Sequence, residues 1–315
     1  MASEINPSAG GKPQADPRQY LNPVTLARIT QLDLRARLVI EGLISGMHRS
    51  PYHGFSVEFA EHREYAAGDD IKYLDWKVYG RSDRYYIKQY EEETNLQLVL
   101  LVDTSESMGY RSAAAAMSKY EYAVTIAASL GYLALKQSDS VGLGLFSDKL
   151  YRFLRPSNQP AFWRTLVQEM HAEVGPKKTD CGQVFHELAE RLTHRSLVVV
   201  LSDLFGDPKR TISGMKHLHY KRHELMVLHV LDPYELEFPF ESPTLFKGLE
   251  QMGQLLTEPR ALRRRYLEEV EKFTQEMKRG CRTMRADFKQ FSTSDSLDAV
   301  LSTFLANRNA TIKRR

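Results

Sequence analysis

The sequence contains little cysteine, no marked excess of either charge and no long apolar run. Its two cysteines, Cys181 and Cys281, are too few for a disulfide framework, which favours a reducing cytoplasm as the location. Because 43 Lys and Arg stand against 40 Asp and Glu, the net charge of +3 does not indicate a nucleic-acid partner. The strongly apolar runs Leu98–Val102 and Leu197–Leu201 are far shorter than the roughly 20 residues of a membrane-spanning helix, so no membrane insertion is expected.

The 315 residues suffice for one large domain or two small ones. Residues 1–23 lack an apolar period and any secretory signal, and we predict a disordered leader there. In residues 24–95 we expect a helix over 26–44, then short strands and tight turns in an aromatic, charged stretch packed on the main domain. Residues 96–306 form the predicted main domain, and residues 307–315 form a basic tail.

From residue 96 onward, apolar runs alternate with segments of helical period. Leu96–Asp103, Leu197–Leu201 and Glu224–Leu231 are typical of buried parallel strands, and acidic residues lie at their carboxyl ends. Further strands are predicted over 140–146 and 150–154, and helices over 114–137, 162–170, 183–192, 260–279 and 296–305. This alternation predicts an α/β domain with an open, mainly parallel sheet flanked by helices, in which ligands bind at the carboxyl ends of the strands.

The sharpest local feature is the segment Asp103-Thr104-Ser105-Glu106-Ser107, directly after the first predicted strand. Alternate side chains of an extended turn face the same way, so Asp103, Ser105 and Ser107 can converge on one point. One carboxylate and two hydroxyls are hard oxygen donors of low charge. Such a set suits Mg²⁺ or Mn²⁺ that keeps some water and an open coordination position.

Two other polar segments, Thr179-Asp180 and Ser202-Asp203, could complete this site from neighbouring strand ends. The alternative is that Ser105 and Ser107 only cap the following helix, because serine favours helix N-caps and turns. The short D-x-S-x-S pattern does not by itself decide between these two interpretations. The order of the segments is more specific: a strand, D-T-S-E-S, a helix, Thr-Asp, and then a strand that ends in Ser-Asp.

This order resembles the metal-ion-dependent adhesion site of von Willebrand factor A-like domains. Further segments are similar to the bacterial domain-of-unknown-function 58 family: Gly54-Phe55, Phe59–Tyr65, Gly68–Trp76, Arg195–Asp203 and Asp232–Glu235. They occur in the order that the family shows, and the resemblance covers residues 26–305. It implies a von Willebrand factor A-like, Rossmann-like fold with an N-terminal extension rich in aromatic residues.

The resemblance also implies a set of residues that bind a divalent cation directly or through water: Asp103, Ser105, Ser107, Thr179 and Asp203. Where the family often has Gly-Gly before the threonine, this chain has Lys177-Lys178. Ammonium groups pointing inward would weaken cation binding by charge repulsion, so we expect these two side chains to point to solvent or to attract an acidic partner. Asp180 could compete with Thr179 as the oxygen donor.

By the same resemblance, the protein would be a binding module without a reaction of its own, in which an acidic residue of a partner completes the metal site. Proteins of this kind often occur beside MoxR-type AAA+ ATPases, which implies an adaptor or substrate recruiter for chaperone-like assembly or maturation of client proteins. A metal-assisted hydrolase is the competing hypothesis. It needs a general base. Glu106 is adjacent in sequence but is expected to face away from Asp103, Ser105 and Ser107, and His194 precedes its strand and lies at the wrong end. In a third hypothesis the metal is only structural.

The remaining polar clusters are predicted to be structural or solvated. In Gly68–Trp76 the acidic residues could form a second cation site or a partner surface, but we favour a turn in which they accept backbone N–H bonds. The other candidates are the histidines and cysteine of the main domain, for which solvated helix faces and an idle thiol are expected: His186, His194, His217, His219, His223 and Cys181.

Overall fold

The computed structural model of the protein describes residues 22–48, 62–64, 79–80, 84–88, 96–171, 174–175, 178–242, 244–247, 254–297 and 299–302. The chain divides into two compact units, residues 1–48 with 96–315, and residues 49–95. In the second unit, β1 (His62–Glu64) and β2 (Tyr86–Lys88) pair antiparallel. The predicted leader (up to residue 21), the whole of Gly68–Trp76 and the basic tail lie outside the described residues.

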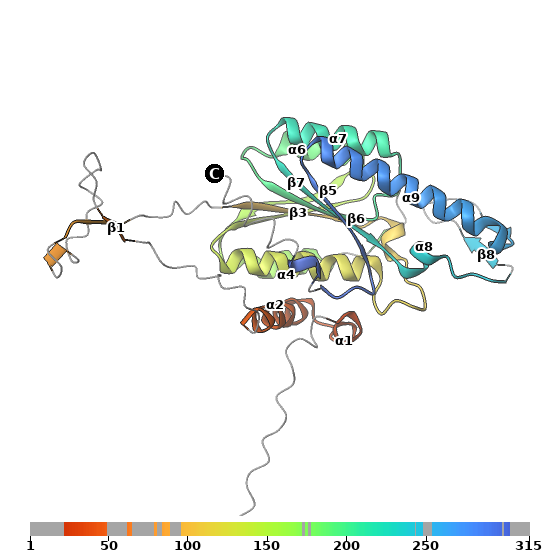
Figure 1. The fold of residues 1–315 in the computed structure, drawn as a ribbon, viewed down its shortest axis with the longest axis horizontal. Coiled ribbons are helices and arrows are strands. Elements are labelled where there is room, and N and C mark those ends of the chain that lie inside the picture. The colour runs from red at the N-terminus through yellow and green to blue at the C-terminus, as the bar shows by residue number, and fades with distance from the viewer. Residues whose placement is uncertain are drawn as a thin grey trace, which may run out of the picture. The chain divides into compact units, whose positions relative to one another are not determined.

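The first unit is built on a six-stranded sheet (Figure 1). Its strands are β3 (Gln97–Asp103), β4 (Ser140–Phe146), β5 (Leu150–Ser157), β6 (Leu197–Ser202), β7 (Glu224–Leu231) and β10 (Asp287–Ser292). Their order is β10-β7-β6-β3-β4-β5, and all neighbours are parallel except β4 and β5. From β3 the chain first adds strands on one side and then, from β6 on, on the other. This doubly wound order confirms the predicted fold class and places the switch point between β3 and β6.

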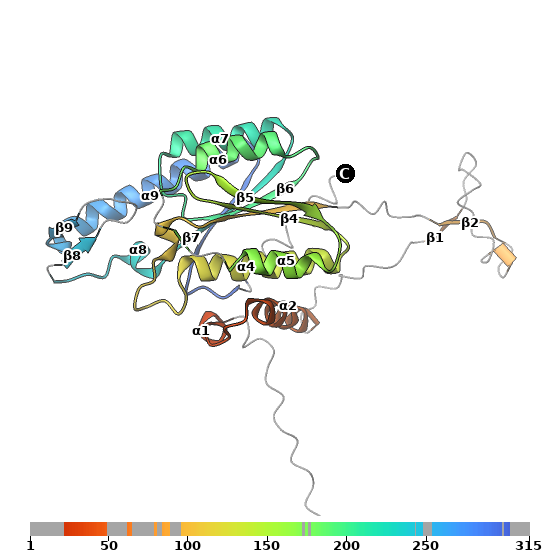
Figure 2. The ribbon, with the colours of Figure 1, turned by 180° about the vertical axis from the view of Figure 1, so that it is seen from behind.

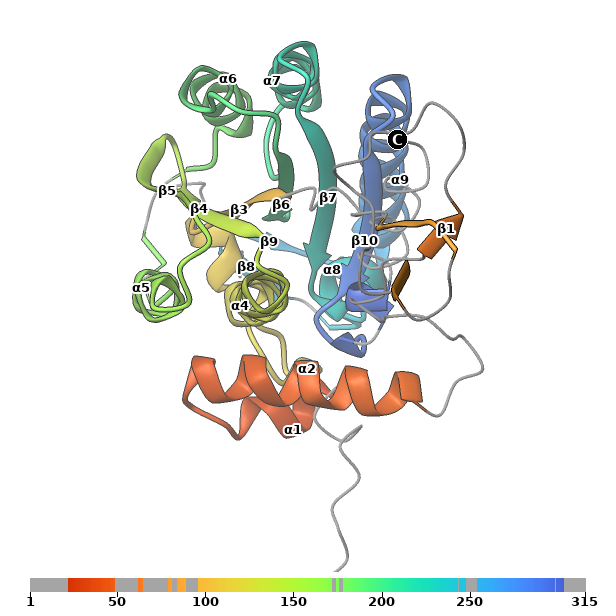
Figure 3. The same cartoon turned by 90° about the vertical axis from the view of Figure 1, so that its left-hand side faces the viewer.

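Helices cover both faces of this sheet (Figures 2 and 3). One face carries α4 (Lys119–Lys136) and α5 (Phe162–Glu169), and the other carries α6 (Cys181–Arg191), α7 (Pro208–Tyr220) and α9 (Pro259–Thr283). Successive residues of β3 serve the two faces: Leu98 and Leu100 belong to the core under α4, whereas Val99 and Leu101 belong to the core under α6 and α9. A strand buried on both faces has to be apolar throughout, which explains its continuous hydrophobic run.

The segment before the sheet forms two helices where the sequence predicted one over 26–44. The helices are α1 (Pro23–Ala27) and α2 (Leu32–His48), and α2 packs against α4. The break is held by the buried Arg35, whose guanidinium donates to the Ile29 carbonyl oxygen at 2.6 Å and to Thr125 Oγ1 of α4 at 3.1 Å. Because Arg35 satisfies the carbonyl between the helices, the chain can turn there and still bury its apolar residues.

The start of α4 also differs from the prediction, because the helix cap sets where the helix begins. α4 begins at Lys119, five residues after the predicted start, because Ser118 and Glu121 form a capping box. The structure also contains elements that were not predicted: α7, α8 (Pro233–Glu237), the edge strand β10, and the antiparallel pair β8 (Thr244–Lys247) and β9 (Gln254–Thr257). None of the helices in the described ranges has the length and apolar character needed to span a membrane.

Two glycines let α6 and α7 lie in direct contact. A Cβ atom at Gly214 of α7 would lie 2.6 Å from the carbonyl oxygen of Gly182, and one at Gly182 would lie 2.8 Å from the Arg210 carbonyl oxygen. Any larger residue would therefore force the helices apart. Their close packing brings the N-terminal ends of α6 and α7, capped by Asp180 and Asp207, to the same edge of the sheet.

Candidate functional site

The carboxyl ends of β3 and β6, the two strands at the switch point, bring together Asp103, Ser105, Ser107 and Asp203, four of the five predicted site residues. Asp103 is the last residue of β3 and is completely buried. Its Oδ1 accepts the Ser105 N–H at 2.9 Å, and the hydroxyl oxygens of Ser105 and Ser107 lie 3.1 Å apart. The turn is a short 3₁₀ helix (Glu106–Gly109) where an extended segment was expected, yet the predicted convergence of the two hydroxyls still occurs.

The hypothesis that these serines only cap a helix is wrong. Ser105 stands at the N-cap of the 3₁₀ helix but makes no side-chain capping bond, and α4 has its own cap at Ser118. The Ser107 hydroxyl instead lies against the Ser105 hydroxyl at 3.1 Å and helps to lower the pKa of Asp203. The hydroxyls therefore belong to the polar cluster at the strand ends.

Ser202, the last residue of β6, links the two strand ends. Its hydroxyl donates to Asp103 Oδ2 at 2.6 Å and accepts the Leu204 N–H at 2.8 Å. Leu204 is fully buried with a positive φ of 55°, an uncommon backbone conformation for leucine. The bond from Leu204 helps to hold this tight turn, in which the Phe205 N–H reaches Asp203 Oδ1 at 3.1 Å.

Asp103 has no cationic partner among the described residues. No basic side chain of the described ranges forms an ion pair with it, and its bonds come from the neutral Ser105 and Ser202. Burial raises the pKa of Asp103, and the nearby charge of Asp203 raises it further, to about 7, although the bonds from serine partly offset the shift.

Asp203, in contrast, is neutralised by a buried lysine that the sequence analysis missed. Lys119, the first residue of α4, is only 1% exposed, and its Nζ donates to Asp203 Oδ2 at 2.8 Å. Burial alone would raise the pKa of Asp203. The attraction of Lys119, with hydrogen bonds from Lys119, Ser107 and the Phe205 N–H, outweighs burial and holds that pKa below its ordinary value.

A second carboxylate completes the surroundings of Lys119. Glu235 Oε1 accepts from Lys119 Nζ at 2.6 Å, while Glu235 Oε2 accepts the Asp232 N–H in a capping box at the start of α8. Asp232 is itself buried and accepts the N–H groups of Ser112 and Tyr234. The Asp232–Glu235 segment that resembles the family therefore has a structural role here: it caps α8 and holds Lys119.

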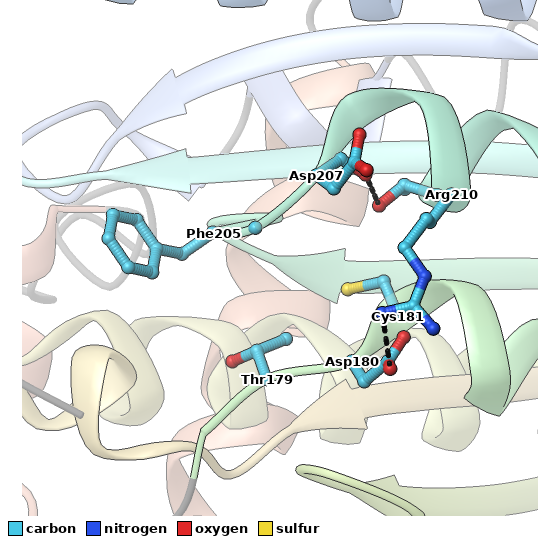
Figure 4. Close-up of a pocket in the computed structure, with 8 residues that line it drawn as sticks. Thr179, Asp180, Cys181, Phe205, Asp207 and Arg210 are labelled. Atoms are coloured by element: carbon cyan, nitrogen blue, oxygen red, sulfur yellow. Dashed lines mark hydrogen bonds and ion pairs between the residues drawn. The ribbon is translucent and has the colours of Figure 1, made fainter. Parts of the chain in front are cut away.

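Thr179 lies at the same edge, on the segment that leads into α6. It borders a pocket of about 70 Å³ together with Phe205 and Gly206 of the loop after β6 (Figure 4). Two residues after Thr179, the sulfur of Cys181 lies 4.0 Å from the hydroxyl oxygen of Ser202, which donates to Asp103. Cation binding by Thr179 stays a prediction.

Asp180, the alternative oxygen donor to Thr179, caps a helix and forms an ion pair. Its Oδ1 accepts the Gln183 N–H as the N-cap of α6, and its Oδ2 lies 3.5 Å from Arg210 of α7. Lys178 is exposed, in agreement with the solvent-facing side chain that we expected, and Lys177 lies outside the described residues. The Asp180 carboxylate is thus engaged in a helix cap and an ion pair, and the choice between Thr179 and Asp180 as oxygen donor stays a prediction.

The donor set at the strand ends fits a small, hard divalent cation. In octahedral coordination with bonds of about 2.0–2.1 Å, neighbouring ligands lie about 3 Å apart, close to the 3.1 Å between Ser105 Oγ and Ser107 Oγ. The uncompensated carboxylate of Asp103 adjoins these hydroxyls. Across the described ranges there is no group of three or more His, Cys, Asp or Glu that could hold a metal, so a cation here would rely on hydroxyls as well as carboxylates.

The histidines differ in part from the expectation. His186 of α6 and His217 of α7, far apart in sequence, lie with their Nδ1 atoms 2.9 Å apart, and His217 also contacts Glu190. His223, expected on a solvated face, is buried and accepts the Ser196 N–H. Cys181 and Cys281 are free and buried, as expected for idle thiols.

One buried histidine contacts the main chain of the site from the neighbouring strand β7. His229 of β7 is fully buried, and its Nε2 donates to the Asp203 carbonyl oxygen at 3.0 Å. Sequence reasoning looked only at residues beside the three loops and missed it, because β7 is a neighbouring strand. Burial lowers the pKa of His229 to about 4, so it stays neutral at pH 7 and supports the backbone of Asp203.

Together, the doubly wound sheet and the serine- and aspartate-rich cluster at its switch point define an α/β domain of the class that binds ligands at strand ends. The sequence model of the family described as "Protein of unknown function DUF58" matches residues 61–276. The chain therefore belongs to this family, which confirms the resemblance noted in the sequence. Helices α1 and α2 lie outside the matched residues.

Several relatives and solved structures are similar to about two thirds of this chain. An uncharacterized protein of Mycobacterium tuberculosis and one of Mycobacterium bovis are each 26% identical to it over 227 residues, covering 69% of this chain and 68% of theirs. The conserved hypothetical protein BatB from Bacteroides thetaiotaomicron has a TM-score of 0.46 at 14% identity, over 70% of this chain and 100% of its own. The SpRpn10 VWA domain has a TM-score of 0.39 at 13% identity, over 66% and 93%.

Proposed function

We propose that the protein is a metal-dependent protein–protein interaction module that acts in the cytoplasm. In this role it recruits client proteins for a MoxR-type AAA+ ATPase that assembles or matures protein complexes. The observation that carries the metal dependence is Asp103, a buried carboxylate without a cationic partner beside two converging hydroxyls. A buried charge is costly unless it is paired or coordinates a metal, and a divalent cation would remove that cost.

Each residue of the site would have its own role in binding the cation. Asp103 supplies negative charge, Ser105, Ser107 and Thr179 supply neutral oxygens, and Asp203 adds a second carboxylate at the far side. Bound there, Mg²⁺ or Mn²⁺ would offer an open coordination position to an acidic side chain of the partner. Because Lys119 already neutralises much of the charge on Asp203, the site as a whole has little surplus negative charge. It would therefore repel an incoming carboxylate less than two free aspartates would.

The surroundings favour binding over hydrolysis. A hydrolase would need a general base within hydrogen-bond reach of a metal-activated water. His229, the histidine that contacts Asp203, is buried beneath the site, and its Nε2 is occupied by a main-chain carbonyl oxygen. The described part of the chain therefore offers no histidine in a suitable place, and we rank hydrolysis second.

The metal dependence is tested by thermal unfolding with and without Mg²⁺ or Mn²⁺. At a free concentration of about 100 times Kd, binding stabilises the fold by about 2.7 kcal/mol, which raises Tm by several degrees. The variant Asp103→Ala is expected to lose this increment. Asp207→Ala is the matched control, since Asp207 is an N-cap at the same edge outside the proposed ligand set. An equal metal response in the wild type and Asp103→Ala would disprove the assignment.

The partner is tested by co-purification with the MoxR-type ATPase of the same organism, with and without EDTA. We expect EDTA and Asp203→Ala to release the ATPase, because the contact would run through the metal. Binding that resists both treatments would show that the metal site is not the contact. Failure of the ATPase to bind at all would remove the proposed partner and leave the metal site to the thermal test.

A further inference from the structure

Two histidines from neighbouring helices meet on the surface that α6 and α7 form. The Nδ1 atoms of His186 in α6 and His217 in α7 lie 2.9 Å apart. The ring centroids are 5.1 Å apart and the ring planes are inclined by 46°, so the rings are not stacked and approach each other through these nitrogens. His186 is exposed, and the side chain of His217 is 26% exposed. An ion from solvent can therefore reach both nitrogens.

The close packing of the two helices sets the distance between these histidines. The contact between Gly182 of α6 and Gly214 of α7 lies about one helical turn before them, since His186 follows Gly182 by four residues and His217 follows Gly214 by three. A Cβ atom at Gly214 would lie only 2.6 Å from the Gly182 carbonyl oxygen. The two imidazoles are therefore held near each other by the backbones of α6 and α7, before any ligand binds.

A carboxylate on the far side of one ring fixes its tautomer. Glu190 Oε1 lies 3.1 Å from His217 Nε2, and because an ionised carboxylate only accepts hydrogen bonds, His217 Nε2 carries a proton. In the neutral ring, His217 Nδ1 is then a lone pair that faces His186. Histidines that bind metals commonly donate their other N–H to a carboxylate in this way, which orients the ring and raises the basicity of the ligating nitrogen.

The one lysine that contacts this group is itself paired. Lys221 Nζ lies 3.1 Å from Glu190 Oε1 and 3.2 Å from Glu190 Oε2, so its charge is compensated by the carboxylate. Lys216 and His219 of α7 are exposed. Since consecutive residues of a helix point about 100° apart, both leave α7 in directions other than that of His217. A cation at the histidine pair therefore meets little uncompensated positive charge.

We propose that His186 and His217 form a second metal site, which takes Cu²⁺, Ni²⁺ or Zn²⁺ and links α6 to α7. Imidazole nitrogen suits these ions, whereas Mg²⁺ prefers oxygen ligands. With bonds of about 2.0–2.1 Å, two nitrogens on one ion lie about 2.9–3.4 Å apart in square-planar, octahedral or tetrahedral geometry. The observed 2.9 Å lies in this range. This inference does not depend on the proposed function.

Binding needs only a small change in one exposed side chain. In the hydrogen-bonded pair, His186 Nδ1 carries the proton that faces His217 Nδ1. On binding, His186 carries its proton on Nε2, and its ring turns so that both Nδ1 lone pairs point at the ion. Across the described ranges no group of three or more His, Cys, Asp or Glu could hold a metal, so water fills the remaining coordination positions.

The test is isothermal titration of the full chain, free of any histidine tag, with Ni²⁺ and Cu²⁺ in excess Mg²⁺. Cu²⁺ should bind more tightly than Ni²⁺. Glu190→Gln should weaken Ni²⁺ binding by about tenfold, and His186→Gln and His217→Gln by at least as much, since each removes a ligand. His219→Gln is the matched histidine control and should bind as the wild type does.

Two further measurements identify the ligands. Glu187→Gln removes the same charge from α6 as Glu190→Gln but pairs with Arg191 and not with a histidine, so it should retain full affinity. Electron paramagnetic resonance of the Cu²⁺-loaded chain should show nitrogen couplings from two imidazoles, and from one in His186→Gln or His217→Gln.

The outcomes separate the histidine pair from the strand ends. Asp103→Ala should bind Ni²⁺ as the wild type does, because none of its contacts reaches α6 or α7 among those described. If Asp103→Ala loses Ni²⁺ while the histidine variants keep it, the ion lies at the strand ends and the second site is wrong. Equal affinities in the wild type, His186→Gln and His217→Gln, or no saturable binding of either ion, would show that the two histidines form a hydrogen bond only.

Discussion

Two neighbouring strands end in buried aspartates that differ in how their charge is compensated. Asp203, at the end of β6, has the ammonium group of Lys119 at 2.8 Å and a pKa below its ordinary value. Asp103, at the end of β3, has only neutral donors, and burial together with the charge of Asp203 raises its pKa to about 7. The same residue type at two adjoining strand ends is thus compensated in two different ways: Asp203 by an ammonium group, and Asp103 only by neutral donors.

The largest expected effect comes from removing the ammonium group of Lys119, which neutralises Asp203 at the end of β6. Lys119→Met would leave Asp203 buried without its partner, and breaking a buried pair in this way costs about 3–5 kcal/mol. Denaturant unfolding measures the loss. Lys136→Met, at the exposed C-terminal end of the same helix, is the control and should cost less than about 1 kcal/mol, since it loses only a contact with the Tyr132 ring.

The double variant Lys119→Met/Asp203→Asn sharpens the interpretation. Because it removes both charges, it should recover part of the stability that the single variant loses. A Lys119→Met protein as stable as the wild type would show that Asp203 does not depend on Lys119. The contrast between the two strand ends would then not hold.

The second prediction concerns the effect of Asp103, the aspartate without a cationic partner, on the pH dependence of stability in metal-free buffer. The folded-state pKa of Asp103, about 7, lies above its ordinary value of 3.8, so the native state binds a proton that the unfolded chain releases. Stability from this group is therefore highest below pH 3.8 and falls as the pH rises from there to about 7. Asp103→Asn lacks this charge and should be more stable than the wild type at pH 8 by about 4 kcal/mol. The gain should shrink as the pH falls and disappear below pH 3.8.

Asp203→Asn should show the opposite sign. Its pKa is lowered in the native state, so its charge stabilises the fold above its ordinary pKa, and the variant should be less stable than the wild type at neutral pH. Asp203→Asn also removes a charge that raises the pKa of His229, so the variants are compared at pH 8, where this histidine is neutral in the folded and the unfolded state. A common sign for Asp103→Asn and Asp203→Asn at pH 8 would contradict the comparison.

The fold was predictable because its strands are buried on both faces. Glu224–Leu231 was predicted with its observed ends, since this central parallel strand is apolar except at Glu224 and His229. The edge strand β10 was missed because it alternates charged and apolar residues and contains Asp287 and Lys289. Helix α7 was missed although Asp207-Pro208 is a helix start signal, since its many basic residues and histidines were interpreted as a solvated stretch.

The candidate site was predictable only where its residues are close in sequence. Asp103, Ser105 and Ser107 follow one strand, and their spacing already indicates convergence. Lys119 could not be found in this way, because its partners Asp203 and Glu235 lie 84 and 116 residues further along the chain. A lysine at the first position of an amphipathic helix is usually solvated, so its burial follows from the sheet topology and from no local pattern.

The smallest effect is expected from removing a hydrogen bond between neutral groups beside Asp103, at the end of β3. The Tyr151 hydroxyl donates to Thr104 Oγ1 at 3.0 Å, and the Thr104 hydroxyl donates to the Phe146 carbonyl oxygen at 2.8 Å. Tyr151→Phe removes only the first bond, and because Tyr151 is partly exposed, water can replace it. The expected loss is about 0.5–1 kcal/mol, and it should be the same at low and high salt, since no charge is involved. Tyr220→Phe on the exposed end of α7 is the control and should have no effect. A salt-dependent loss for Tyr151→Phe would mean that this hydroxyl acts on the charge of Asp103, so that the end of β3, too, is electrostatically compensated.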